Sequence, residues 1–135
     1  MANVIKINSG IQTYRFFDEE DNLITSFSIN PADISLLARC EETQQFFEEN
    51  KLEDAKTVQE MLRINDAIEK QIDYLLGAES TIFKKPLTAT TVMPDGRIFA
   101  EVILDTVLEY IKPELEKRAK AKKERLDKYV AKYNQ

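Results

Sequence analysis

The chain has 135 residues, of which 43% are hydrophobic and 32% are charged, so it is long and apolar enough to bury one core. Its single cysteine excludes an internal disulfide. The lack of histidine removes the usual base for serine or cysteine chemistry and the commonest transition-metal ligand. No apolar run approaches the roughly 20 residues of a membrane span, and the first residues do not resemble a secretory signal. We therefore expect a cytoplasmic protein without a membrane partner.

The net charge of −5 is distributed unevenly along the chain. Residues 1–112 hold 11 Lys and Arg against 20 Asp and Glu, a net charge of −9, whereas residues 113–135 hold eight against four, a net charge of +4. This contrast predicts a single α+β domain over 1–112 and a basic C-terminal helical extension over 113–135. An acidic body argues against nucleic-acid binding, and the acids scattered through the extension favour a solvated helix face there.

Three runs near the start of the chain, residues 3–7, 11–17 and 23–29, predict strands. In the third run, apolar and polar residues alternate with the period of a strand that buries one face. The simplest arrangement is a small antiparallel β-meander with a turn at residues 8–10. The acidic stretch at 18–21 lacks the spacing of a calcium loop, so we interpret it as a solvated turn.

Helical patterns follow this β element. Asn30 and Pro31 predict a helix start, with Asn30 as the cap, and the helix continues to about Asn50. Residues 50–56 either break that helix or continue it. A clearer amphipathic helix begins at Val58 and ends at Gly77, where glycine allows the left-handed backbone of a helix C-cap.

The next segment, residues 78–96, contains two prolines and is predicted to be a loop, with a short strand possible over 87–93. We expect Phe83 to tie this loop to the core. Residues 98–111 carry a broad apolar face, which predicts the central helix of a helical bundle. Pro113 predicts either a kink or the restart of a new helix.

Beyond Pro113, apolar residues recur along one side of a lysine-rich helix. This narrow stripe suggests a helix that uses a partner's surface, either another protein or a second copy of the chain in a homo-oligomer. Ordinary core packing is the competing interpretation for the residues before Pro113. The candidate partner-binding residues are Ile98, Val102, Tyr110, Leu115, Leu126, Tyr129, Val130 and Tyr133.

The sequence predicts no catalytic, cofactor or metal site. Cys40 is interpreted as a small buried apolar residue, because no histidine is present to activate it. None of the many carboxylate pairs stands in a marked apolar setting. We therefore predict that the protein is not an enzyme and needs no cofactor.

Residues 23–112 resemble the small tail assembly chaperones and related tail proteins of tailed bacteriophages and prophages. The resemblance lies in three places: the Phe-Ser-Ile-Asn-Pro-Ala-Asp sequence at 27–33, the helix end at 72–77 followed by Phe83, and the Asp-Gly-Arg-Ile-Phe-Ala entry at 95–100 into the apolar helix. The family has no catalytic signature. Its fold begins with a short β element and continues as helices, in agreement with the predicted α+β, mostly α class.

The resemblance implies a non-enzymatic protein in the host bacterial cytoplasm. Such a chaperone would hold a long helical tape measure protein in solution while the tail tube assembles around it. The chain departs from the family pattern at Leu76, where an aromatic residue is expected, and at Lys84, where a second glycine is expected. The alternative is a structural or adaptor module that self-associates through its C-terminal helix.

Overall fold

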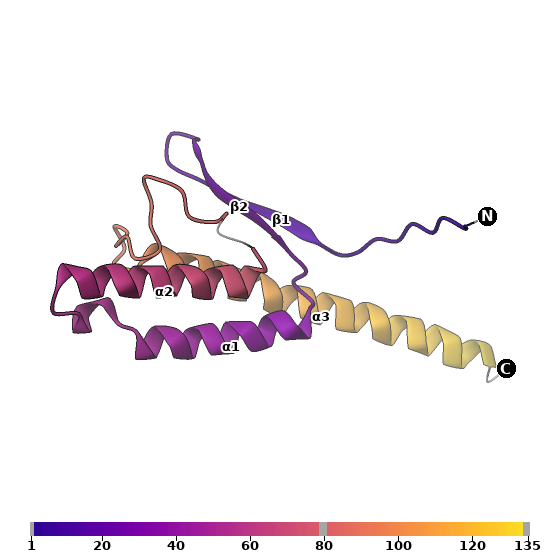
Figure 1. Cartoon of the computed structure of the whole chain (residues 1–135). Coiled ribbons are helices and arrows are strands. Elements are labelled where there is room, and N and C mark those ends of the chain that lie inside the picture. Colours follow the sequence, from indigo (N-terminus) through magenta and orange to yellow (C-terminus); the bar gives the residue numbers. More distant parts are fainter. Residues whose placement is uncertain (1, 79–80, 134–135) are drawn as a thin grey trace.

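A computed structural model describes residues 2–78 and 81–133 of the chain. A two-stranded hairpin precedes the helices, and Figure 1 shows α1 and α2 side by side while α3 runs out beyond them. The arrangement confirms the predicted α+β class, mostly helical. The elements are β1 (Gln12–Phe17), β2 (Leu23–Ile29), α1 (Ile34–Glu49), the short 3-10 helix η1 (Leu52–Asp54), α2 (Val58–Leu76) and α3 (Phe99–Tyr133).

The hairpin pairs β1 with β2 in antiparallel register, with Tyr14 opposite Phe27. Its turn contains the acidic stretch 18–21. The Asp18 side chain accepts hydrogen bonds from the backbone N–H groups of Glu20 and Asn22, both at 2.9 Å. These bonds hold the pKa of Asp18 below its ordinary value, and the bond from the Asn22 N–H has the largest effect. The acidic stretch therefore has a local role as a turn.

The predicted first strand over residues 3–7 is wrong. Residues 2–11 run as an extended segment outside the sheet, which has two strands in the described part of the chain. Val4, Ile5 and Ile7 are each more than 80% exposed. We call residues 2–11 the arm, and Figure 1 shows it leaving the body of the molecule.

The start of α1 also differs from the prediction. Asp33 is its cap, not Asn30, and the Asp33 carboxylate accepts a hydrogen bond from the Ser35 N–H at 2.9 Å. The Asn30 side chain accepts instead from Ala32 and from Arg118, so it braces the turn before the helix. At the other end, α1 stops at Glu49 and η1 follows, so residues 50–56 form a break.

The predicted α2 is confirmed at both ends. Thr57 caps its start by accepting a hydrogen bond from the Glu60 N–H at 3.1 Å. Gly77 ends it with φ at +66°, the left-handed conformation that the sequence predicted. Ile68 and Ile72 are buried against the core.

The loop after α2 is tied down by more than Phe83. The Phe83 ring meets the Phe99 ring edge-on at 5.9 Å between centroids, but it remains half-buried, whereas Ile82 and Ala89 are fully buried. The short strand suggested over 87–93 does not form, and this stretch contributes one bridge, between Val92 and Ile98. The loop thus docks through small and branched side chains as well as an aromatic one.

The first half of α3 is the central helix, as predicted. Its face at Ile103 and Val107 is buried. It also contacts the hairpin, where the Tyr14 and Tyr110 rings lie 4.9 Å apart between centroids. This face holds the sheet and the other helices together.

Of the two alternatives predicted at Pro113, the restart does not occur, because α3 continues through it as one helix. A proline in a helix removes one N–H donor, which leaves the carbonyl four residues earlier without its partner. That residue, Glu109, is exposed, so water can satisfy its carbonyl. The boundary predicted between residues 112 and 113 therefore lies inside a single helix. Across residues 2–78 and 81–133, no helix combines the length and the apolar character that crossing a bilayer requires.

Candidate protein-binding site

The apolar face of α3 continues past the body of the molecule. Residues three or four positions apart share one face of a helix. Val107 and Ile111 are buried on this face and Leu115 is half-buried. The next positions at this spacing are Ala119 and Lys122, after which apolar residues return at Leu126 and Tyr129. These last two side chains are 53% and 61% exposed. The stripe that the body covers as far as Leu115 is therefore uncovered in the extension.

The structure divides the predicted partner-binding residues into two groups. Ile98, Val102 and Leu115 are partly buried against the core, and the ring of the exposed Tyr110 contacts that of Tyr14 at a tilt, so these four support the fold. A second group remains exposed on the extension: Leu126, Tyr129 and Val130. The side chain of Tyr133 lies outside the described part of the structure. We call Leu126, Tyr129 and Val130 the apolar seam.

An arginine that the sequence analysis did not single out holds the arm beside α3. Arg118 donates to the Gly10 carbonyl at 2.9 Å and to the Asn30 side-chain oxygen at 2.7 Å, and its Nε donates to Glu114 at 3.1 Å. A Cβ added to Gly10 would lie 2.7 Å from Arg118 Nη1 and would displace the guanidinium, and the φ of +77° at Gly10 also favours glycine. We call this set of contacts the Arg118 clamp.

The clamp was in principle detectable from the sequence. Arg118 follows Ile111 and Leu115 at the spacing of the buried face of α3. A charged residue at such a position needs polar partners when it packs against the body. The sequence does not say which backbone group supplies them, because Gly10 is more than 100 positions away.

A groove opens where the arm and α3 leave the body. It is a hollow of about 620 Å³ lined by residues 8–12 of the arm side and by Glu114, Lys117, Arg118 and Ala121 of α3. Beneath it, the Tyr14 hydroxyl donates to Gln12 at 2.8 Å. Burial raises the pKa of Tyr14, and the nearby charge of Glu114 adds to this rise.

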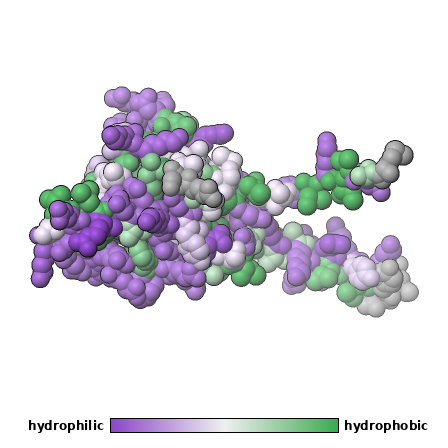
Figure 2. Space-filling model, in the orientation of Figure 1, coloured by the Kyte–Doolittle hydropathy of each residue, from purple (hydrophilic) through white to green (hydrophobic). Residues whose placement is uncertain are grey.

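Hydrophobic surface borders this groove on both sides. Figure 2 shows apolar surface over much of the arm and patches of it on the end of α3, both standing clear of the body. On the arm side these residues are Val4, Ile5, Ile7 and Ile11, each at least 59% exposed. Two uncovered apolar surfaces that start from one clamp are typical of a site that receives another protein segment.

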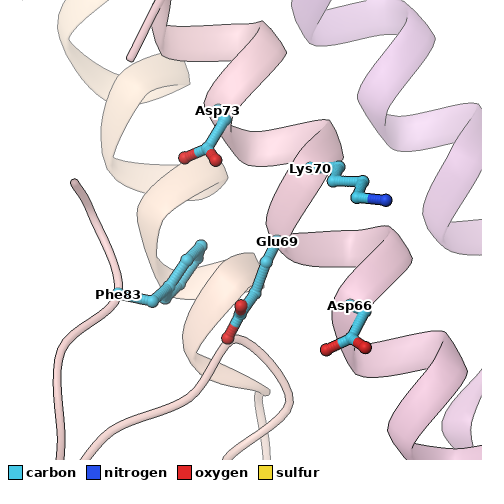
Figure 3. Close-up of a pocket in the computed structure, with 5 residues that line it drawn as sticks. All are labelled: Asp66, Glu69, Lys70, Asp73 and Phe83. Atoms are coloured by element: carbon cyan, nitrogen blue, oxygen red, sulfur yellow. The ribbon is translucent and has the colours of Figure 1, made fainter. Parts of the chain in front are cut away.

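A second hollow, of about 200 Å³, lies on α2 and is lined by Asp66, Glu69, Lys70, Asp73 and Phe83. In Figure 3, Phe83 reaches from the loop towards Glu69, while Lys70 points away from Glu69 and Asp73. The Glu69 carboxylate accepts hydrogen bonds from Asn65 and from the Ala89 N–H, so it serves the docking of the loop. The five residues that line this hollow include no hydroxyl or thiol nucleophile.

Cys40 is fully buried in α1, as the sequence predicted. Burial raises the pKa of its thiol to about 11, so the thiol is neutral at pH 7. Within residues 2–78 and 81–133, no three His, Cys, Asp or Glu side chains gather closely enough to hold a metal ion.

Comparisons of the chain with protein-family models, with curated proteins and with solved structures found no match.

Proposed function

We propose that this protein is a non-enzymatic tail assembly chaperone of a bacteriophage or prophage, acting in the host bacterial cytoplasm. It would bind the tape measure protein and keep it soluble during tail morphogenesis. The sequence resemblance over residues 23–112 supports this choice of client, and the structure adds a surface that is suited to binding protein.

The observation that carries the proposal is the uncovered face of α3. Leu126, Tyr129 and Val130 are each at least 53% exposed, although they continue the stripe that is buried at Ile111. An apolar stripe on a helix is the usual complement of an amphipathic partner helix. A tape measure protein, being a long helical protein, offers such stripes to its chaperone.

Co-expression with the tape measure protein of the same genome tests this proposal. We expect the two proteins to purify together through a tag on one of them, and the soluble yield of the client to rise. The double variant Leu126→Ser/Tyr129→Ser should lose the client. Absence of co-purification by the unaltered chain, together with unchanged client solubility, would refute the chaperone function.

A matched control is available at the tip of the hairpin. Leu23 is 57% exposed, close to the 53% of Leu126, but it lies on β2. Leu23→Ser removes the same kind of exposed side chain from a different surface. We expect this variant to retain the client, and an equal loss in both variants would mean that hydrophobicity alone, wherever it lies, recruits the client.

A further inference from the structure

We propose that the extension binds an acidic amphipathic helix of about 20 residues along its apolar seam. This inference rests on the proposed function and specifies the chemistry of the client segment. Its basis is the charge around the apolar seam, which differs from the charge of the body.

The extension surrounds its apolar seam with cations. Residues 113–135 carry a net charge of +4, against −9 for residues 1–112. By helical spacing, Arg125 and Lys132 continue the line of Ala121, which borders the groove, and Lys123 lies on the other side of the seam. A helix with acids beside its apolar stripe would place opposite charges along both edges of this site.

Arg118 is committed to the clamp, since it already contacts Gly10, Asn30 and Glu114. Lys117 lies nine residues before Leu126 and so on the opposite side of α3, whereas Lys123 and Arg125 flank the seam and are exposed. These cations have long flexible stems that can lie along apolar surface while their charged ends meet a partner. They therefore provide the attraction, while Arg118 fixes the shape of the groove.

Charge also favours an acidic client over a second copy of the chain as the occupant of this site. Two copies that paired through their extensions would bring two segments of +4 together, and like charges oppose that contact. The net negative charge of residues 1–112 opposes an acidic client, whereas the extension attracts it. The extension, at about 1.5 Å per residue over roughly 20 residues, is about 30 Å long and matches a helix of five to six turns.

The probes for this proposal are two synthetic peptides of about 20 residues with the same leucine stripe. One carries glutamates beside the stripe and the other carries lysines at the same positions. Fluorescence anisotropy with the full chain measures their binding. We expect the acidic peptide to bind about tenfold more tightly than the basic one, and its affinity to fall as salt increases.

Two charge reversals form a matched pair. Arg125→Glu should weaken the acidic peptide about tenfold, since Arg125 borders the seam. Lys120→Glu changes the net charge by the same amount, but Lys120 lies nine residues, or two and a half turns, before Tyr129 and thus on the opposite side. We expect Lys120→Glu to change the affinity by no more than about twofold. Equal effects of the two variants, or equal binding of the two peptides, would overturn the proposal.

Light scattering of the full chain identifies the competing occupant. We expect a monomer at the concentrations used for binding. A dimer that Leu126→Ser dissociates, and that Leu23→Ser leaves intact, would show that a second copy occupies the apolar seam and would overturn the proposal. If the tape measure protein co-purifies while the two peptides bind equally, the charge proposal fails and the chaperone function stands. If the acidic peptide binds as described but the tape measure protein does not, the charge proposal stands and the chaperone function fails.

Discussion

The apolar stripe of α3 is buried in the first half of the helix and exposed in the second half. In the first half, the stripe at Ile103, Val107 and Ile111 is buried and holds the hairpin and the other helices together. In the extension, the stripe is exposed at Leu126 and Tyr129, and the surrounding charge changes from acidic to basic. A hydrophobic pattern thus identifies a helix face that packs against another surface. The rest of the chain decides whether that surface belongs to the same molecule or to a partner.

Truncating buried side chains of the body should have the largest effect on stability. Ile72 and Ile103 are both 0% exposed. Replacing either with alanine leaves a cavity, so we expect the free energy of unfolding to fall by about 2–5 kcal/mol. Urea denaturation followed by circular dichroism measures this change. A loss below about 1 kcal/mol would mean that the site is not a packed core.

A polar contact of the body should give the next largest effect. The Asn65 side-chain oxygen accepts hydrogen bonds from the Thr90 N–H at 3.1 Å and from the Thr90 hydroxyl at 2.8 Å. Asn65→Ala leaves these donors without that acceptor and should cost about 1–3 kcal/mol. The same denaturation measurement applies, and Asn65→Asp, which keeps the oxygen acceptor but loses the amide that donates to Glu69, should also destabilise the fold. Should both variants unfold like the unaltered chain, Asn65 would not anchor the loop.

The end of α2 should respond less. Gly77 has φ at +66°, and an added Cβ would meet no atom within 4 Å. The cost of Gly77→Ala is therefore that of the left-handed backbone alone, about 1 kcal/mol. A fall of about 4 °C or more in the melting temperature is expected, given the size of the domain. An unchanged melting temperature would contradict the assigned cap.

The smallest effect is expected in the extension, and it sharpens the comparison. Leu126→Ala removes a side chain that is 53% exposed in the isolated chain, so the free energy of unfolding should change by less than about 0.5 kcal/mol. The same change should weaken client binding. A loss of stability as large as that of Ile103→Ala would show that Leu126 belongs to the core of an oligomer.

Local patterns predicted most of the elements. The amphipathic period fixed α2 and the buried half of α3, and Gly77 identified the end of α2 because few other residues tolerate its backbone. The apolar seam was also predicted, since Leu126 and Tyr129 keep the helical spacing of the face before Pro113. These features depend on neighbours in sequence, which a single chain displays directly.

The features that the sequence did not predict depend on distant contacts. The arm has the composition of a strand, but Arg118 holds Gly10 so that the arm points away from β1. Asn30 looked like a helix cap, yet its side chain is used by the same arginine. In both cases a residue in the middle of α3 overrides the local preference of a segment about 90 to 110 positions earlier.

Hydrogen–deuterium exchange of the full chain, alone and with the tape measure protein, shows whether the extension is uncovered until the client binds. For the isolated chain, the account predicts strong protection of the amides in α2 and in the buried half of α3, and fast exchange in residues 119–132. Addition of the client should protect residues 119–132 and leave the hairpin turn unchanged. Strong protection of residues 119–132 without the client, or protection that appears on α1 instead, would contradict the account.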